Sequence, residues 1–252
     1  MIDLDPLLLN YSEPFPLIIL AGGAGTRLNK INKDIPKIMT PIGNSIFLDY
    51  FMDNLKKLGF NELYFLIFPD EKKLIENHLM KFHNKGKVKI SFLYDGEERL
   101  GTGGSIYKNI NNLPKIFWTM YGDTLLNFDI LNSQNAFQKS RKEALLTVIR
   151  KEVVAESPNI KILNNEIISY SKNNSVENNF VDYGAMIFKN SVFKNHKSKN
   201  FDLGLVIQKL INEKNVEHIE MSHKFYEMGN LSSFKTLDQI LIKNNIKSLW
   251  DE

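Results

Sequence analysis

Cysteine is absent from the 252 residues of the chain. Disulfide frameworks and thiolate metal sites are therefore excluded, and a reducing compartment fits this composition. No apolar run approaches the roughly 20 residues that cross a bilayer, and Met1 to Pro16 lacks the basic start and long apolar core of a signal peptide. We therefore expect a cytoplasmic protein that does not bind a membrane.

The sequence also has little net charge, +3 from 32 Lys and Arg against 29 Asp and Glu. Acids and bases are interspersed, without the basic stripe that is typical of nucleic-acid binding. A chain of this length can bury a sizeable core as one domain. We expect a small-molecule partner and a single domain over residues 16–252, preceded by an N-terminal extension over residues 1–15.

A glycine-rich loop follows the first apolar run, Leu17 to Leu20. The run is typical of a buried strand. Gly22, Gly23 and Gly25 let backbone N–H groups approach phosphate oxygens closely, and Arg27 adds a charged, forked donor. No Gly-Lys-Ser/Thr closes the loop, and the third glycine of a dinucleotide fingerprint is missing, so a Walker loop and a dinucleotide site are excluded. A turn that only redirects the chain is the alternative.

Strand and helix patterns alternate over residues 16–150 and predict a parallel sheet with helices on both faces. The helix expected at residues 71–82 has four apolar residues that we expect to face inward, Leu74, Ile75, Leu79 and Phe82. Ligands of such sheets bind beyond the carboxyl ends of the strands, where the strand order reverses. The expected elements are strands at 17–20, 63–68, 88–94, 116–121 and 144–149 and helices at 46–58, 71–82 and 128–139.

Two further loops are expected at carboxyl strand ends. The loop from Asp95 to Gly104 contains Gly101, Thr102 and Gly103, and such a backbone suits a planar base and ribose, although a surface turn is the alternative. Asp123 follows the most apolar strand, where a carboxylate is costly unless it meets a cation. With phosphates nearby, the expected cation is Mg²⁺, which takes one or two carboxylates and leaves its other positions to water and phosphate oxygens.

Short strands and turns dominate after Arg150 and predict a small β-rich cover over the sheet. Gly184 lies within an expected strand, which it weakens unless something approaches its backbone closely. The expected elements are strands at 159–163, 167–170, 180–188 and 216–219 and helices at 202–210 and 232–242.

Six segments of the chain form a recognisable set: LAGGAGTRL at 20–28, PKIMTPIG at 36–43, LGTGG at 100–104, YGDTLL at 121–126, VDYG at 181–184 and FYEMG at 225–229. Together they resemble the sugar-phosphate nucleotidylyltransferases, which transfer a nucleoside monophosphate from an NTP to a sugar 1-phosphate and release pyrophosphate. Within that family the chain looks most like the heptose- and mannose-1-phosphate guanylyltransferases, which implies synthesis of surface-polysaccharide precursors. The implied fold is α/β, a Rossmann-like mixed, mostly parallel sheet with helices on both faces and a small β-rich sugar-binding cover.

The resemblance also implies site residues and divides the domain into a nucleotide-binding half, 16–150, and a sugar-phosphate half, 151–252. The implied catalytic residues are Arg27, Lys37 and Asp123. The implied nucleotide-binding residues are Leu20, Ala21, Gly22, Gly23, Gly25, Thr26, Gly101, Thr102 and Gly103. The implied sugar-phosphate-binding residues are Asn159, Lys172, Asp182 and Gly184. The implied ligands of Mg²⁺ are Asp123 and Glu227, although Glu227 could instead be a surface acid paired with Lys224.

Three positions depart from the family pattern. Lys172 lacks the neighbouring glutamate and proline of a Glu-Lys-Pro segment, Tyr183 stands where alanine is common, and Glu227 stands where aspartate is common. Two other functions stay open: a cytidylyltransferase for a non-sugar phosphate, and a catalytically silent relative that binds nucleotide sugars. The base, the acceptor and the oligomeric state are also open, and a homo-oligomer is compatible with the sequence.

Overall fold

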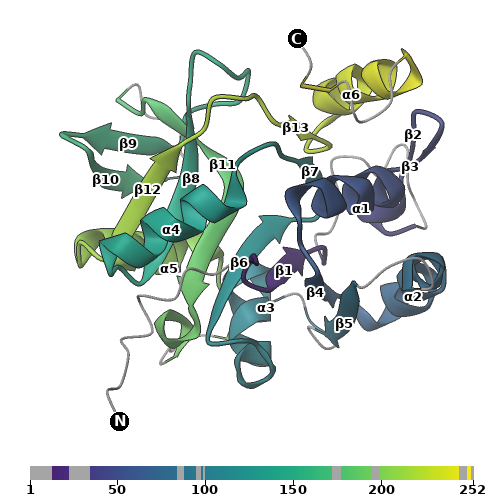
Figure 1. Ribbon diagram of the computed structural model, residues 1–252, viewed down its shortest axis with the longest axis horizontal. Coiled ribbons are helices and arrows are strands. Elements are labelled where there is room, and N and C mark those ends of the chain that lie inside the picture. Colours follow the sequence, from purple (N-terminus) through teal and green to yellow (C-terminus); the bar gives the residue numbers. More distant parts are fainter. Residues whose placement is uncertain are drawn as a thin grey trace.

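The computed structural model describes residues 13–22, 35–83, 88–94, 98, 100–171, 177–194, 199–243 and 249–250. They form a nine-stranded sheet with helices on both faces (Figure 1). Its strands are β1 (Leu17–Leu20), β4 (Glu62–Ile67), β5 (Lys89–Tyr94), β6 (Ile116–Tyr121), β8 (Ala144–Arg150), β9 (Ile160–Leu163), β10 (Glu166–Tyr170), β11 (Phe180–Lys189) and β12 (Val216–Glu220). Two small sheets pair β2 (Pro41–Ile42) with β3 (Ser45–Ile46) and β7 (Thr124–Leu125) with β13 (Tyr226–Glu227).

The parallel part of the sheet has the order β5-β4-β1-β6. The chain therefore adds β4 and β5 on one side of β1 and then returns to its other side with β6. Leu20 pairs with Leu66 of β4 and with Tyr121 of β6, so the three carboxyl ends are level. This reversal of strand order lies between β1 and β6, which is where open α/β sheets bind ligands.

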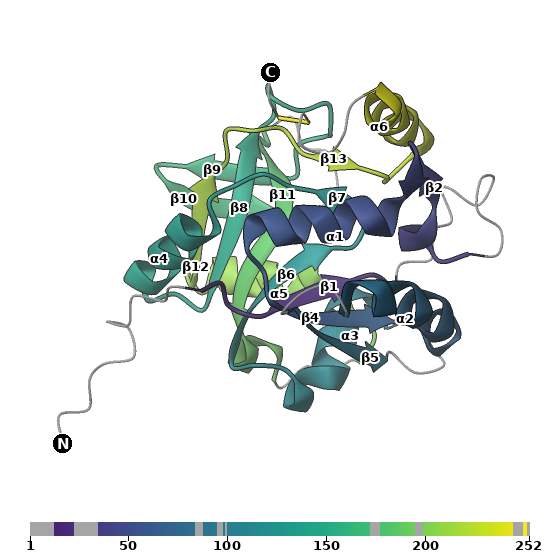
Figure 2. The same cartoon turned by 45° about the vertical axis from the view of Figure 1, so that its right-hand side comes forward.

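Each face of the sheet is covered by its own helices and buries its own apolar cluster. Leu17 and Ile19 of β1 point into one cluster and Ile18 into the other, as expected of alternating strand residues. The first cluster contains residues of α1 (Phe47–Leu58), α2 (Pro69–His83), α4 (Ile130–Ser140) and α6 (Leu231–Lys243). The second contains residues of α3 (Gly101–Asn109) and α5 (Leu203–Asn212). Figure 2 shows α6 beside β2, and the two elements are in contact.

The prediction for the inward face of α2 is wrong at Leu74, which is 47% exposed. Ile75 and Leu79, four residues apart, are the buried pair. Leu74 precedes Ile75 by one residue and therefore lies about 100° around the helix, outside this stripe. Phe82 lies outside the residues whose side chains the structure describes.

The mixed character of the sheet begins at β11, which runs antiparallel to both β6 and β8. The β9–β10 hairpin joins the sheet through Phe180 of β11. Asn164 and Asn165 both have positive φ, 50° and 63°, as two-residue hairpin turns require. The expected mixed sheet with its small β-rich cover is thus confirmed.

Phe15 belongs to the packed core although it precedes β1. Its side chain is buried, its N–H donates to Gln134 Oε1 at 2.8 Å, and its ring meets Phe137 edge-on. The packed domain therefore includes this last residue of the segment that the sequence assigns to an extension. None of the helices in the described ranges combines the length and apolarity of a bilayer-spanning segment.

Candidate active site

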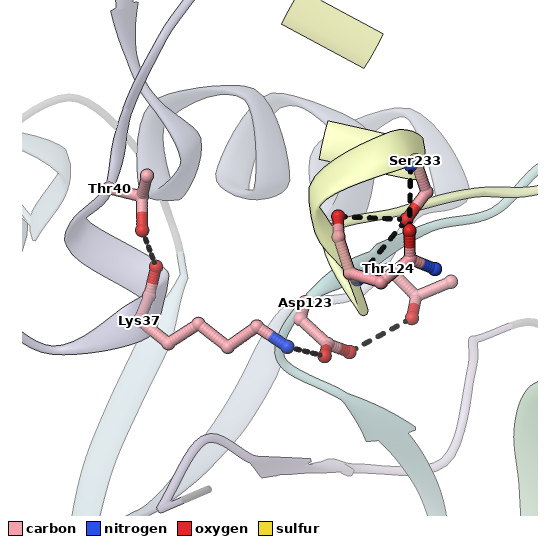
Figure 3. Close-up of polar contacts among 6 residues, drawn as sticks. Lys37, Thr40, Asp123, Thr124 and Ser233 are labelled. Atoms are coloured by element: carbon pink, nitrogen blue, oxygen red, sulfur yellow. Dashed lines mark hydrogen bonds and ion pairs between the residues drawn. The ribbon is translucent and has the colours of Figure 1, made fainter. Parts of the chain in front are cut away.

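Lys37 and Asp123 form an ion pair at the carboxyl edge of the sheet (Figure 3). Lys37 opens a short 3-10 helix, η3 (Lys37–Met39), directly after Pro36, and its carbonyl accepts a hydrogen bond from the Thr40 hydroxyl. Asp123 follows β6, and its Oδ1 accepts a hydrogen bond from the Thr124 hydroxyl at 3.1 Å. The two charged side chains are 16% and 27% exposed, so both remain accessible to a ligand.

Gly122 brings the ends of β1 and β6 together. A Cβ at this position would lie 3.1 Å from Ala21 Cα, and the Gly122 N–H donates to the Leu20 carbonyl at 3.1 Å. The start of the glycine-rich loop at Gly22 therefore lies close to Asp123. Five predicted site residues lie outside the described ranges, and their roles stay predictions: Gly23, Gly25, Thr26, Arg27 and Lys172.

Glu227 lies close to Asp123 through the pairing of two short strands. Glu227 of β13 pairs with Thr124 of β7, and the Met228 N–H donates to the Asp123 carbonyl at 2.9 Å. The Glu227 carboxylate folds over Gly229, where a Cβ would lie 2.3 Å from Oε1. Tertiary structure thus places the backbones of these two acids close together, and their common role as metal ligands stays a prediction.

Asp123 and Glu227 fit Mg²⁺ better than they fit a transition metal. Mg²⁺ takes one or two carboxylates and keeps water and phosphate oxygens as its other ligands. Within the described part of the chain, no group of three or more His, Cys, Asp or Glu is arranged to hold an ion. Two carboxylates are therefore compatible with Mg²⁺, and binding of the ion by Asp123 and Glu227 stays a prediction.

Gly101, Thr102 and Gly103 form the first turn of α3, whereas the sequence predicts a loop there. A Cβ on Gly103 would lie 2.5 Å from the Phe201 ring. The N–H groups of Gly103 and Gly104 both donate to the Phe201 carbonyl at 3.0 Å, and the Thr102 hydroxyl accepts from the N–H of Leu203. Close packing against the segment before α5 therefore requires glycine here, and nucleotide binding by this turn stays a prediction.

Three of the four residues expected to bind a sugar phosphate lie together. The Asp182 N–H donates to Asn159 Oδ1 at 2.8 Å, and the Gly184 N–H donates to Asp182 Oδ1 at 2.9 Å. Gly184 has a φ of +99° at an irregularity of β11, a conformation that favours glycine. A Cβ on Gly184 would lie 3.5 Å from the ring of Tyr121, so this group adjoins the strand that ends before Asp123.

Sequence reasoning missed the part that Tyr170 plays in this group. Its hydroxyl donates to Asp182 Oδ2 at 2.9 Å and interacts with the Tyr121 hydroxyl. Burial raises the pKa of Asp182 to about 6, although hydrogen bonds from the Gly184 N–H and the Tyr170 hydroxyl oppose the shift. Burial also raises the pKa values of Tyr121 and Tyr170. Strand alternation gave no signal for Tyr170, because a register shift between Ile167 and Ser169 leaves Ile167 and Tyr170, three residues apart, as the buried residues of β10.

Tyr183 does not enter the predicted sugar-phosphate pocket. It is fully buried, and its hydroxyl donates to the Asn127 carbonyl at 2.9 Å and accepts from the Asn127 N–H at 3.1 Å. Its ring packs edge-on against Phe128 and Phe225. Neighbouring residues of a strand point to opposite faces of the sheet. The large Tyr183 side chain therefore points away from the face of Asp182 and leaves the predicted sugar-phosphate pocket unchanged.

Two curated proteins illustrate what this chain is similar to. Over 238 residues the chain is 26% identical to the bifunctional protein GlmU of Methanococcus aeolicus, a match that covers 90% of this chain and 54% of that protein. Over 113 residues it is 35% identical to the D-glycero-alpha-D-manno-heptose 1-phosphate guanylyltransferase of Campylobacter jejuni, covering 45% and 49%. The matched parts thus span about half the length of these curated relatives.

The fold also matches a solved structure, the inositol-1-phosphate CTP transferase from T. maritima. The TM-score is 0.78 at 21% identity, and the match covers 95% of this chain and 98% of that one. The model of the nucleotidyl transferase family matches residues 17–244, which include β1, the Lys37–Asp123 pair and Glu227. By this match the chain belongs to the nucleotidyl transferase family.

Proposed function

We propose that this chain transfers a nucleoside monophosphate from an NTP to a sugar 1-phosphate, giving an NDP-sugar and pyrophosphate. The observation that carries the proposal is the Lys37–Asp123 pair, which lies next to the end of β1, where the strand order reverses. A cation and a metal-binding carboxylate at this point suit a triphosphate. Residues 16–150 would bind the nucleotide and residues 151–252 the acceptor.

The proposed chemistry needs positioning and charge rather than a nucleophilic side chain. A phosphate oxygen of the acceptor attacks the α-phosphorus in line, the bond from the α-phosphorus to the bridging oxygen breaks, and pyrophosphate leaves with the electron pair. Lys37 and Arg27 would neutralise the negative charge that grows on the phosphate oxygens. Mg²⁺, held by Asp123 and Glu227, would supply further neutralisation of those oxygens.

The acceptor would be held by Asn159, Lys172, Asp182 and Gly184. Three of these residues form one hydrogen-bonded group next to Tyr121, which supports a common binding role. The similarity to a heptose 1-phosphate guanylyltransferase favours a hexose or heptose 1-phosphate and a role in surface-polysaccharide precursor synthesis.

A second candidate acceptor is a polyol phosphate. The similarity of the fold to an inositol-1-phosphate CTP transferase favours it, with CTP as the nucleotide. A catalytically silent sensor of nucleotide sugars is less well supported, because binding alone does not require the carboxylate of Asp123 beside Lys37.

Pyrophosphate release tests the proposal. The chain is incubated with Mg²⁺ and each of the four NTPs, in combination with mannose, glucose and heptose 1-phosphates, inositol 1-phosphate and an amino-alcohol phosphate. We expect release that depends on one sugar 1-phosphate. Release with inositol 1-phosphate or the amino-alcohol phosphate alone would assign the second candidate. Tight binding of an NDP-sugar without release from any pair would contradict an enzymatic function.

A further inference from the structure

We propose that Tyr170 is a positioning residue for acceptor binding: its hydroxyl holds the Asp182 carboxylate in the orientation that receives hydroxyl groups of the acceptor. The inference rests on the proposed function, in which Asp182 contacts the acceptor. Tyr170 comes from β10, an element that carries none of the predicted site residues.

The Asp182 carboxylate is held from two sides. Its Oδ1 accepts the Gly184 N–H at 2.9 Å and its Oδ2 accepts the Tyr170 hydroxyl at 2.9 Å. Since each carboxylate oxygen has two lone-pair directions, each retains one for a further donor. The side chain therefore presents two oriented acceptors, which suits the hydroxyl groups of a polyhydroxylated acceptor.

Tyr170 is itself held at three points. Its backbone N–H donates to Gln208 Oε1 at 3.2 Å, and its ring lies against Gly204, where a Cβ would be 3.3 Å from Cε1. Its hydroxyl reaches Asp182, and its side chain is 9% exposed. The β9–β10 hairpin, the first turn of α5 and the bulged part of β11 thus meet at this one residue.

The hydroxyl of Tyr170 also interacts with that of Tyr121, the last residue of β6. Two residues later in the chain stands Asp123, which pairs with Lys37. Tyr170 therefore links the Asp182 carboxylate, which would bind the acceptor, with β6, the strand that ends at the proposed metal site. The hydroxyl of Tyr170 can fix where the acceptor lies relative to the nucleotide, and the phenyl ring of a phenylalanine at this position cannot.

The test compares Tyr170→Phe with Tyr183→Phe. Both changes remove one buried phenolic hydroxyl next to the same strand segment, but Tyr183 bonds to Asn127 on the opposite face. We expect Tyr170→Phe to raise the KM for the acceptor on the order of tenfold, the cost of a hydrogen bond to a charged group, with the KM for the NTP unchanged. Tyr183→Phe should change neither KM.

A second readout does not need turnover. Carbon NMR of the Asp182 carboxyl group should show a higher pKa in Tyr170→Phe than in the parent, because the charged form loses a donor, and no change in Tyr183→Phe. Equal acceptor KM and equal Asp182 pKa in Tyr170→Phe and the parent would overturn the inference, as would equal shifts in both variants. If the parent releases no pyrophosphate with any pair, the proposed function fails. The NMR comparison then still decides whether Tyr170 holds Asp182.

In an Asp182→Asn background, Tyr170→Phe should raise the acceptor KM by a smaller factor than it does in the parent, since the two residues act as one unit. Independent effects that multiply would place Tyr170 outside this unit and contradict the inference.

Discussion

Lys37 forms an ion pair with Asp123, 86 residues further along the chain. Both side chains are partly exposed, so the pair adds little to the stability of the fold and remains open to a ligand. A triphosphate with Mg²⁺ would offer new partners to both side chains, phosphate oxygens to the ammonium and the metal to the carboxylate. Under the proposed function, the pair would therefore link nucleotide binding to metal binding.

Lys37→Ala is expected to lower turnover by at least about 100-fold, because the cation serves the transition state. The midpoint of thermal unfolding should change little, since a partly exposed ion pair contributes at most about 1 kcal/mol. Lys89→Ala is a matched control, because it also removes a lysine from an ion pair, with Glu62, but at the amino ends of β4 and β5, opposite to the carboxyl edge of the sheet. Initial rates of pyrophosphate release and thermal melts check both variants. Parental turnover in Lys37→Ala would remove Lys37 from the site.

We expect the same loss of turnover for Arg27→Ala.

Glu227→Gln is expected to raise the Mg²⁺ concentration that gives half-maximal activity, because one of two charged ligands becomes neutral. Asp123→Asn should abolish activity at every Mg²⁺ concentration. The effects on Mn²⁺ binding, measured by electron paramagnetic resonance in the presence of a non-hydrolysable NTP, should not add in the double variant, since both residues act on one ion. A Mg²⁺ dependence of Glu227→Gln that matches the parent would leave Asp123 as the ligand and return Glu227 to a surface role.

Gly103→Ala is expected to destabilise the fold by about 1–3 kcal/mol, since an added methyl would overlap the Phe201 ring and overpack the contact between α3 and the segment before α5. Gly104→Ala should cost at least as much, because its Cβ would lie 2.3 Å from the backbone oxygen of Lys199. Urea denaturation measures both. Parental stability combined with a loss of NTP binding would instead favour a direct ligand contact at this turn.

Asp182→Asn is expected to change how stability depends on pH. The pKa of Asp182 is raised from 3.8 to about 6 in the folded chain, so between these values the folded state binds more protons than the unfolded state. The free energy of unfolding of the parent therefore falls as pH rises through this window. The advantage of Asp182→Asn over the parent should grow from about pH 4 to about pH 6 and then level off. Urea denaturation at several pH values provides the measurement. A difference that stays constant with pH would show that the carboxyl group is not destabilised by burial.

Strands and local turns could be predicted from the sequence because their causes are local. The run Ile116 to Tyr121 is apolar apart from Thr119, as is typical of a strand buried on both faces, and β6 has these bounds. Asn164 and Asn165 tolerate positive φ, which predicts their hairpin turn. Leu74 shows the limit of such patterns, since one step around a helix separates a buried from an exposed residue.

The sequence by itself determined the order of strands and helices, the glycine-rich end of the first strand and the acidic residue after β6, because apolar periodicity and backbone permissiveness are properties of short segments. Tertiary structure alone decided that Lys37 meets Asp123, that Glu227 pairs with Thr124, and that Tyr170 holds Asp182. It also decided that Gly103 packs on Phe201. These contacts join segments far apart in the chain, and their geometry depends on strand order, register and side-chain packing, which no local pattern specifies.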